Sequence, residues 1–301
     1  MGIFTSEISQ FLSIVGVDSL TLPSGILAQG IISLFAESSK LFFILLAPFV
    51  AFAVVIHWLE YLSQRRMSER LGWKSVLWTG WLGTPVHELS HVFMCRVFRH
   101  RIDDVALFEP DRDSGRLGYV KHSFEAGNWF QEMGNLFIGV APLLGGSAVL
   151  VILLWLFYPD AAANAAESTR LTFEDSSLLQ VWGSVAAVVT KIVTISNLTT
   201  VRFWTFVYLV LCVGSHMAPS RCDYQGASRG VVWLGGILLI SVFLLACVGV
   251  NGRQMINGMI GIMGPLFAAL GLAVLLCGLT TTLVFSLTAL IPRCHDIGDE
   301  H

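Results

Sequence analysis

The chain has 301 residues, of which 54% are hydrophobic and only 13% are charged, and its formal net charge is −3. A soluble domain carries roughly a quarter charged residues, so this composition, with a mean hydropathy of +0.71, predicts an integral membrane protein. The slightly acidic charge, without a strongly basic face, excludes nucleic acid as a partner.

The sequence predicts an all-α, polytopic membrane fold with about six transmembrane helices, because six apolar runs each approach the ~20 residues needed to cross a bilayer. These runs cover about 41–62, 73–98, 129–158, 202–217, 231–250 and 264–291. Residues 1–40 are expected to be an interfacial segment, 41–292 one integral domain with its core at 73–230, and 293–301 a polar C-terminal tail.

Two segments between the predicted spans have open interpretations. Residues 177–198 are long enough to cross a membrane, but Lys191 and several polar residues equally suit an interfacial helix. Residues 99–128 contain two extended-looking halves around the turn formers of PDRDSG. They predict a small β-hairpin between the second and third spans, with an irregular loop as the alternative.

The motif that carries chemistry is HELSH, residues 87–91, inside the second predicted span. Histidines at positions i and i+4 of a helix lie on one face, so His87 and His91 can bind the same metal ion. Glu88 beside them can reach a metal-bound water and accept its proton. Ionisable groups at bilayer depth are costly and usually functional. The alternative is a polar cluster that hydrogen-bonds to neighbouring helices.

A zinc site needs a third protein ligand, with a fourth position left to water. Residue 97 is Val, which rules out a third histidine six residues after His91. The best candidate is Asp223, just after the fourth predicted span. With six spans, and 177–198 not crossing fully, Asp223 and the HELSH helix lie on the same side of the bilayer.

HELSH in a membrane helix, followed two spans later by HMAPSRCD, resembles the site-2 protease family of intramembrane zinc metalloproteases. The resemblance covers about residues 73–230. Pro219 and Asp223 match the proline and aspartate of the family's second motif, whereas His216 replaces its asparagine and Tyr224 replaces its glycine. These departures indicate a remote or atypical member.

The resemblance implies one Zn²⁺ per chain, held by His87, His91 and Asp223, with Glu88 as the general base. His216 is a further catalytic candidate, as an oxyanion donor or a ligand, and a polar group at a helix end is its alternative. Asn135 is a weaker candidate for substrate contact. The implied substrate is a membrane protein cleaved in or near its transmembrane segment after local unwinding, which the hairpin can hold by strand addition.

The resemblance also implies an active-site face toward the cytoplasm, since basic residues are spread too evenly to decide the orientation. An accessory membrane partner is expected for substrate recruitment, because no peptide-binding domain is evident. Two other functions stay open. One is a scaffold or chaperone without proteolytic activity, and the other is a metal transporter, which the scarcity of further His, Asp and Glu in the spans disfavours.

Overall fold

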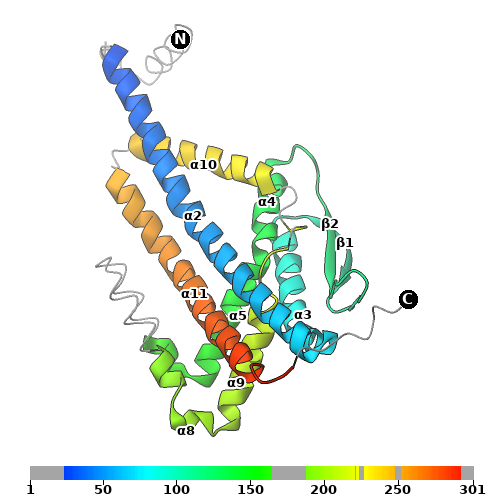
Figure 1. Ribbon diagram of the computed structural model, residues 1–301. Coiled ribbons are helices and arrows are strands. Elements are labelled where there is room, and N and C mark those ends of the chain that lie inside the picture. The colour runs from blue at the N-terminus through cyan, green and yellow to red at the C-terminus, as the bar shows by residue number, and fades with distance from the viewer. Residues whose placement is uncertain (1–23, 165–187, 221, 224–226, 248–251, 293–301) are drawn as a thin grey trace.

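A computed structural model describes residues 24–164, 188–220, 222–223, 227–247 and 252–292 (Figure 1), and the fold is described for these residues. The chain is mostly helical. The helices and strands follow one another as α2 Ser24–Leu71, α3 Trp73–Val97, β1 Arg101–Ala106, β2 Tyr119–Ser123, α4 Trp129–Gly139, α5 Ala141–Phe157, α8 Ile195–Leu198, α9 Val201–Gly214, α10 Ala227–Cys247 and α11 Gly252–Leu287.

Two long helices, α2 and α11, run side by side along the molecule (Figure 1). Polar contacts lie near one end of the pair. Thr281 Oγ1 of α11 donates to the Leu59 carbonyl of α2 at 3.4 Å, and Arg66 Nε of α2 donates to Oγ1 of Thr288, the residue after α11, at 3.1 Å. Residues 24–40, expected as an interfacial segment, continue into the first predicted span as one helix. Residues 1–23 and 293–301 lie outside the described part of the chain.

Three helices of the described residues are long and apolar enough to cross a membrane, namely 39–71, 227–245 and 262–287. The number rises to four if α4 and α5, which are bent by 53° at their junction, count as one span. The six predicted spans are therefore not confirmed as a set. Helix α9, with 14 residues, is shorter than these three helices. Helix α3 is not among the candidate spans because its Gly, Thr, Ser, His and charged residues lower its mean hydropathy.

The orientation of α10 also differs from that of the other long helices. In Figure 1 it runs across α2 rather than alongside it, and its first part lies against α4. Among the described residues, the predicted segment 177–198 is represented only from residue 188 onward, and its predicted partial crossing falls mostly outside them.

The core lies where α5, α9 and α11 meet. Its fully buried side chains include Leu143, Leu150, Phe206, Val210 and Leu270. Helix α3 packs against α5 and α9 on one flank of this core.

A glycine makes the approach between α3 and α9 close. A Cβ atom at Gly83 would lie 2.0 Å from the Cys212 carbonyl oxygen of α9, so only glycine fits there. The part of α3 that carries HELSH is thereby held directly against the end of α9.

The predicted β-hairpin is confirmed. Strands β1 and β2 pair antiparallel, from Arg101 opposite Ser123 to Ala106 opposite Tyr119, with an irregularity between Ile102 and Asp104. Both strands contact α3, so the hairpin lies against the helix that carries HELSH.

Candidate metal centre

Helix α3 brings His87 and His91 together as the i, i+4 spacing predicts. Their ring centroids are 4.9 Å apart, and the two Nε2 atoms are 3.2 Å apart. His91 is buried, and only 14% of the His87 side chain is exposed. Two imidazoles therefore converge on one small volume inside the protein.

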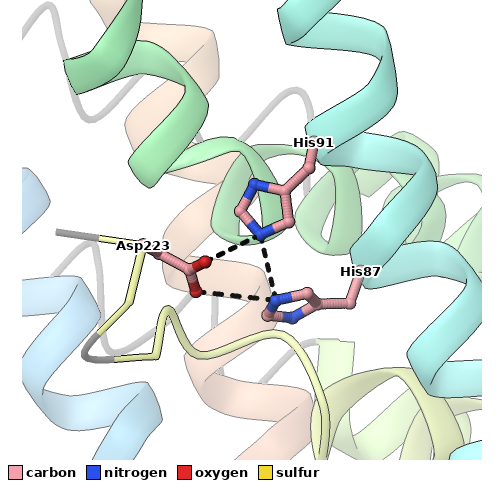
Figure 2. Close-up of side chains that lie close together, drawn as sticks. All are labelled: His87, His91 and Asp223. Atoms are coloured by element: carbon pink, nitrogen blue, oxygen red, sulfur yellow. Dashed lines mark hydrogen bonds and ion pairs between the residues drawn. The ribbon is translucent and has the colours of Figure 1, made fainter. Parts of the chain in front are cut away.

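Asp223 completes the group from a different part of the chain (Figure 2). Its Oδ1 lies 3.1 Å from His91 Nε2, and its Oδ2 lies 3.6 Å from His87 Nε2. One ligand atom from each of the three residues lies within 4.8 Å of the others. The predicted juxtaposition of HELSH with Asp223, 132 residues after His91 by difference in numbering, is present in the fold.

The loop that carries Asp223 consists of residues 215–220 and 222–223 and is called the Asp223 loop below. Its last turn is closed by two hydrogen bonds, from Asp223 N to Ser220 O at 3.2 Å and from Ser220 N to Asp223 Oδ2 at 2.5 Å. Helix α4 ends against it. A Cβ atom at Gly139 would lie 2.4 Å from the Asp223 carbonyl oxygen. The carboxylate is thus fixed by its own turn and by the end of α4.

The backbone sets the tautomers of the two histidines. His87 Nδ1 lies 2.7 Å from the His216 carbonyl oxygen, and His91 Nδ1 lies 2.9 Å from the Ile138 carbonyl oxygen. A carbonyl oxygen can only accept a hydrogen bond, so each Nδ1 carries a proton and is the hydrogen-bond donor. In neutral imidazoles the Nε2 atoms then present lone pairs to one another and to the Asp223 carboxylate.

This convergence of lone pairs is unfavourable unless a positive charge lies among them. A metal cation supplies that charge, and histidines whose other nitrogen donates to a carbonyl are typical metal ligands. Protonation of an imidazole is the alternative source of charge. Two imidazoles and a carboxylate form a donor set that suits zinc with a position left open. The residues therefore fit a metal ion, and the fold supplies the partners that orient them.

Glu88 follows His87 on α3 and is 7% exposed. Within the described chain, no group donates a hydrogen bond to its carboxylate. The hairpin covers it, because a Cβ atom at Gly118, next to β2, would lie 3.0 Å from Glu88 Cγ and 2.9 Å from Thr84 Cγ2. Glu88 is thus enclosed between α3 and the hairpin, beside the two histidines.

His216 lies at the start of the Asp223 loop and is not one of the three grouped residues. Its carbonyl orients His87, as described above, while its buried ring packs against Gly80 and Gly83 of α3. Its Nδ1 lies 3.1 Å from Ser215 Oγ, and its Nε2 has no partner among the described residues. The predicted catalytic role of the ring stays a prediction, whereas the role of the carbonyl was not predicted.

Sequence reasoning missed a second layer of polar residues on α2. Glu60 accepts a hydrogen bond from Ala218 N of the Asp223 loop at 2.8 Å. Gln64, one turn later, donates to the Ser215 carbonyl. The sequence did offer a signal, because a carboxylate within an apolar run usually has a polar partner elsewhere in the protein.

A histidine pair ties the hairpin to the end of α3 and the start of α4. His100 Nδ1 lies 3.0 Å from His122 Nδ1, and His100 Nε2 donates to the Gln131 carbonyl oxygen at 2.8 Å. Burial lowers the pKa of His100, and burial together with the neighbouring His100 lowers the pKa of His122. Both rings are therefore neutral near pH 7 and are available as a donor and acceptor pair.

No protein-family model, curated protein or solved structure matches this chain.

Proposed function

We propose that this protein is a membrane-embedded zinc metalloprotease that cleaves a membrane protein in or near its transmembrane segment. One observation carries the proposal. His87, His91 and Asp223 converge with Nε2 and carboxylate oxygen atoms facing one another, while backbone carbonyls hold each Nδ1. The three apolar helices long enough to cross a membrane support the location, and the resemblance of the HELSH and HMAPSRCD segments to site-2 proteases supports the reaction.

Each residue of the site has a role in this proposal. His87, His91 and Asp223 hold the zinc ion, which supplies Lewis acidity toward water and toward the peptide carbonyl. Glu88, buried and without a hydrogen-bond donor in the described chain, accepts the proton of the attacking water and passes it to the leaving amine. The carboxylate lies on the same helix as both histidines, so α3 fixes the base relative to the metal.

The substrate must be extended when it reaches the site, because a peptide bond inside a helix is shielded by its own hydrogen bonds. The hairpin offers a place for such a segment, since each strand of a two-stranded sheet has one unpaired edge. Asn135 of α4 is a further candidate for contact. Its Nδ2 is buried and has no partner in the part of the chain that the structure describes, one turn before Ile138, which contacts His91, and Gly139, which contacts Asp223.

The test of the reaction is Glu88→Gln. The amide keeps the size of the side chain but cannot take a proton, so hydrolysis should fall at least about 100-fold, the lower bound for general base catalysis. The measurement uses purified protein in detergent and a panel of synthetic transmembrane peptides interrupted by Gly or Pro. Products are identified by mass spectrometry, and the zinc content of each sample is measured in parallel.

Glu125→Gln is the matched control, because Glu125 is exposed in the connection between β2 and α4. It should cleave as the wild type does. Cleavage at the wild-type rate by Glu88→Gln would contradict the proposed base. Zinc bound in the wild type without cleavage of any peptide would favour the scaffold function instead.

A further inference from the structure

We propose that Glu60 and Gln64 of α2 are positioning residues that hold the Asp223 loop so that Asp223 meets His87 and His91. The inference rests on the metal site of the proposed function and extends it to a helix that contributes no ligand. It concerns two polar side chains inside the apolar helical segment 39–71.

The contacts form a two-point attachment. Glu60 Oε2 accepts from Ala218 N at 2.8 Å, and Glu60 Oε1 accepts from Gln64 Nε2 at 3.2 Å. Gln64 Nε2 also donates to the Ser215 carbonyl oxygen. One side chain therefore binds an N–H group of the loop, the other binds a carbonyl three residues earlier, and the two side chains bind each other.

These loop groups have few other partners available. Helix α9 ends at Gly214, so the carbonyl of Ser215 lies beyond the helical hydrogen-bond pattern. Ser215 and Ala218 are 2% and 7% exposed, and buried backbone groups without partners are costly. Glu60 and Gln64 satisfy both groups from outside the loop.

The attachment to α2 alternates with the attachment to the metal-binding helix. Between Ser215 and Ala218, the carbonyl of His216 accepts from His87 Nδ1. The loop is therefore fastened to α2, then to α3, then to α2 again, before the Ser220–Asp223 turn presents the carboxylate. Loss of the α2 contacts should free the loop on the side that sets both the His87 tautomer and the position of Asp223.

Two apolar residues at positions 60 and 64 would insert into a membrane more favourably than Glu60 and Gln64, because ionisable side chains at bilayer depth are costly and are usually functional. The contacts of the two side chains with the Asp223 loop give the polar pair its function. Residues that orient metal ligands in this way typically change metal affinity by about 10- to 100-fold when mutated.

The test compares Glu60→Leu, Glu60→Gln and Gln64→Leu with the wild type. Thr281→Val is the matched control, because it removes a polar contact between α2 and α11, next to Glu60, without touching the loop. Each purified protein is stripped with a chelator and titrated with zinc against a chromophoric competitor, and its thermal unfolding is recorded without metal.

We expect Glu60→Leu to weaken zinc binding about 10- to 100-fold. Gln64→Leu should weaken it less, because the bond from Ala218 N survives. Glu60→Gln should recover most of the affinity, since its amide oxygen can still accept from Ala218 N. Thr281→Val should bind zinc as the wild type does. A residue that only stabilised the fold would lower the unfolding temperature without this graded loss of affinity.

Wild-type affinity in Glu60→Leu, or an equal loss in Thr281→Val, would overturn the inference while leaving the metal site intact. If Glu60→Leu fails to fold, Gln64→Leu decides, and wild-type zinc affinity in that variant overturns the inference. A wild-type protein that takes up no zinc would overturn both the inference and the proposed function, so the two failures are distinguishable.

Discussion

At the scale of single residues, the site depends on atoms that bind no metal. The Ile138 and His216 carbonyls decide which nitrogen of each histidine faces the centre. Because both carbonyls accept a hydrogen bond from an Nδ1–H group, the Nε2 lone pairs are directed inward. The same imidazoles with Nε2 protonated would repel a cation. The backbone thus orients both imidazoles as the proposed zinc site requires, whereas the same two side chains could otherwise form an ordinary polar cluster.

Gly139→Ala tests the placement of Asp223 from the side of α4. A Cβ atom there would lie 2.4 Å from the Asp223 carbonyl oxygen, so the loop or the end of α4 must shift. Misplacement of one ligand should weaken zinc binding at least about 10-fold, as loss of a ligand-orienting contact does. Zinc titration of the purified variant gives the affinity.

Gly236→Ala provides the matched control, because a Cβ atom on Gly236 of α10 meets nothing within 4 Å. It should leave the affinity unchanged. Equal zinc affinity in Gly139→Ala and the wild type would mean that contact with α4 does not place the carboxylate.

The local sequence spacing was sufficient to predict that His87, Glu88 and His91 lie close together, because they fall within about one turn of a helix. Asp223 could be predicted from its position after an apolar run and from the resemblance of its flanking residues. The position of Glu60 in an apolar run is a signal, but its partner Ala218 is 158 residues away and local spacing does not identify it. The orienting carbonyls are likewise 129 and 47 residues from their histidines. Backbone carbonyls, moreover, leave no signal in a sequence.

At the scale of elements, α3 combines two properties that conflict in a membrane. It carries the polar HELSH motif, and the residues of this motif and its other polar residues make it less apolar than the three candidate membrane spans. Burial against α5 and α9 and the cover of the hairpin resolve the conflict. The hairpin itself was predictable from PDRDSG and its extended flanks, but its position over Glu88 depends on Gly118 and could not be read from spacing.

The His100–His122 pair predicts that the hairpin loosens in acid. Both pKa values are lowered below the ordinary 6.5. The unfolded hairpin therefore binds more protons than the folded one below about pH 6.5, and its stability falls as the pH drops through that range. Hydrogen-exchange protection factors of residues 101–123, corrected for the intrinsic rate, should decrease between pH 7.5 and 5.

His122→Gln serves as the comparison, because the amide can still donate to His100 but does not titrate. Its protection should fall less steeply with pH than that of the wild type. Protection that is independent of pH in the wild-type hairpin would contradict the role of the histidine pair.

At the scale of the whole molecule, composition predicted a helical membrane protein, and three helices of the described chain have the length and apolarity to cross a membrane. The prediction of about six spans assumed that every apolar run crosses the bilayer alone. The bend between α4 and α5, the shortness of α9 and the crossing course of α10 arise from tertiary packing, which apolar length does not encode (Figure 1). The site lies where α3, the end of α4 and the Asp223 loop meet, with α2 behind the loop.

We propose that this meeting point holds zinc, and the metal content of the purified protein, measured by mass spectrometry, tests the proposal. Protein purified in detergent without added metal is compared with His87→Ala and Asp223→Ala. We predict one zinc per wild-type chain and its loss from both variants, because each removes one of three protein ligands. Wild-type protein without zinc would rule out the proposed metal site and leave HELSH as a polar cluster between helices.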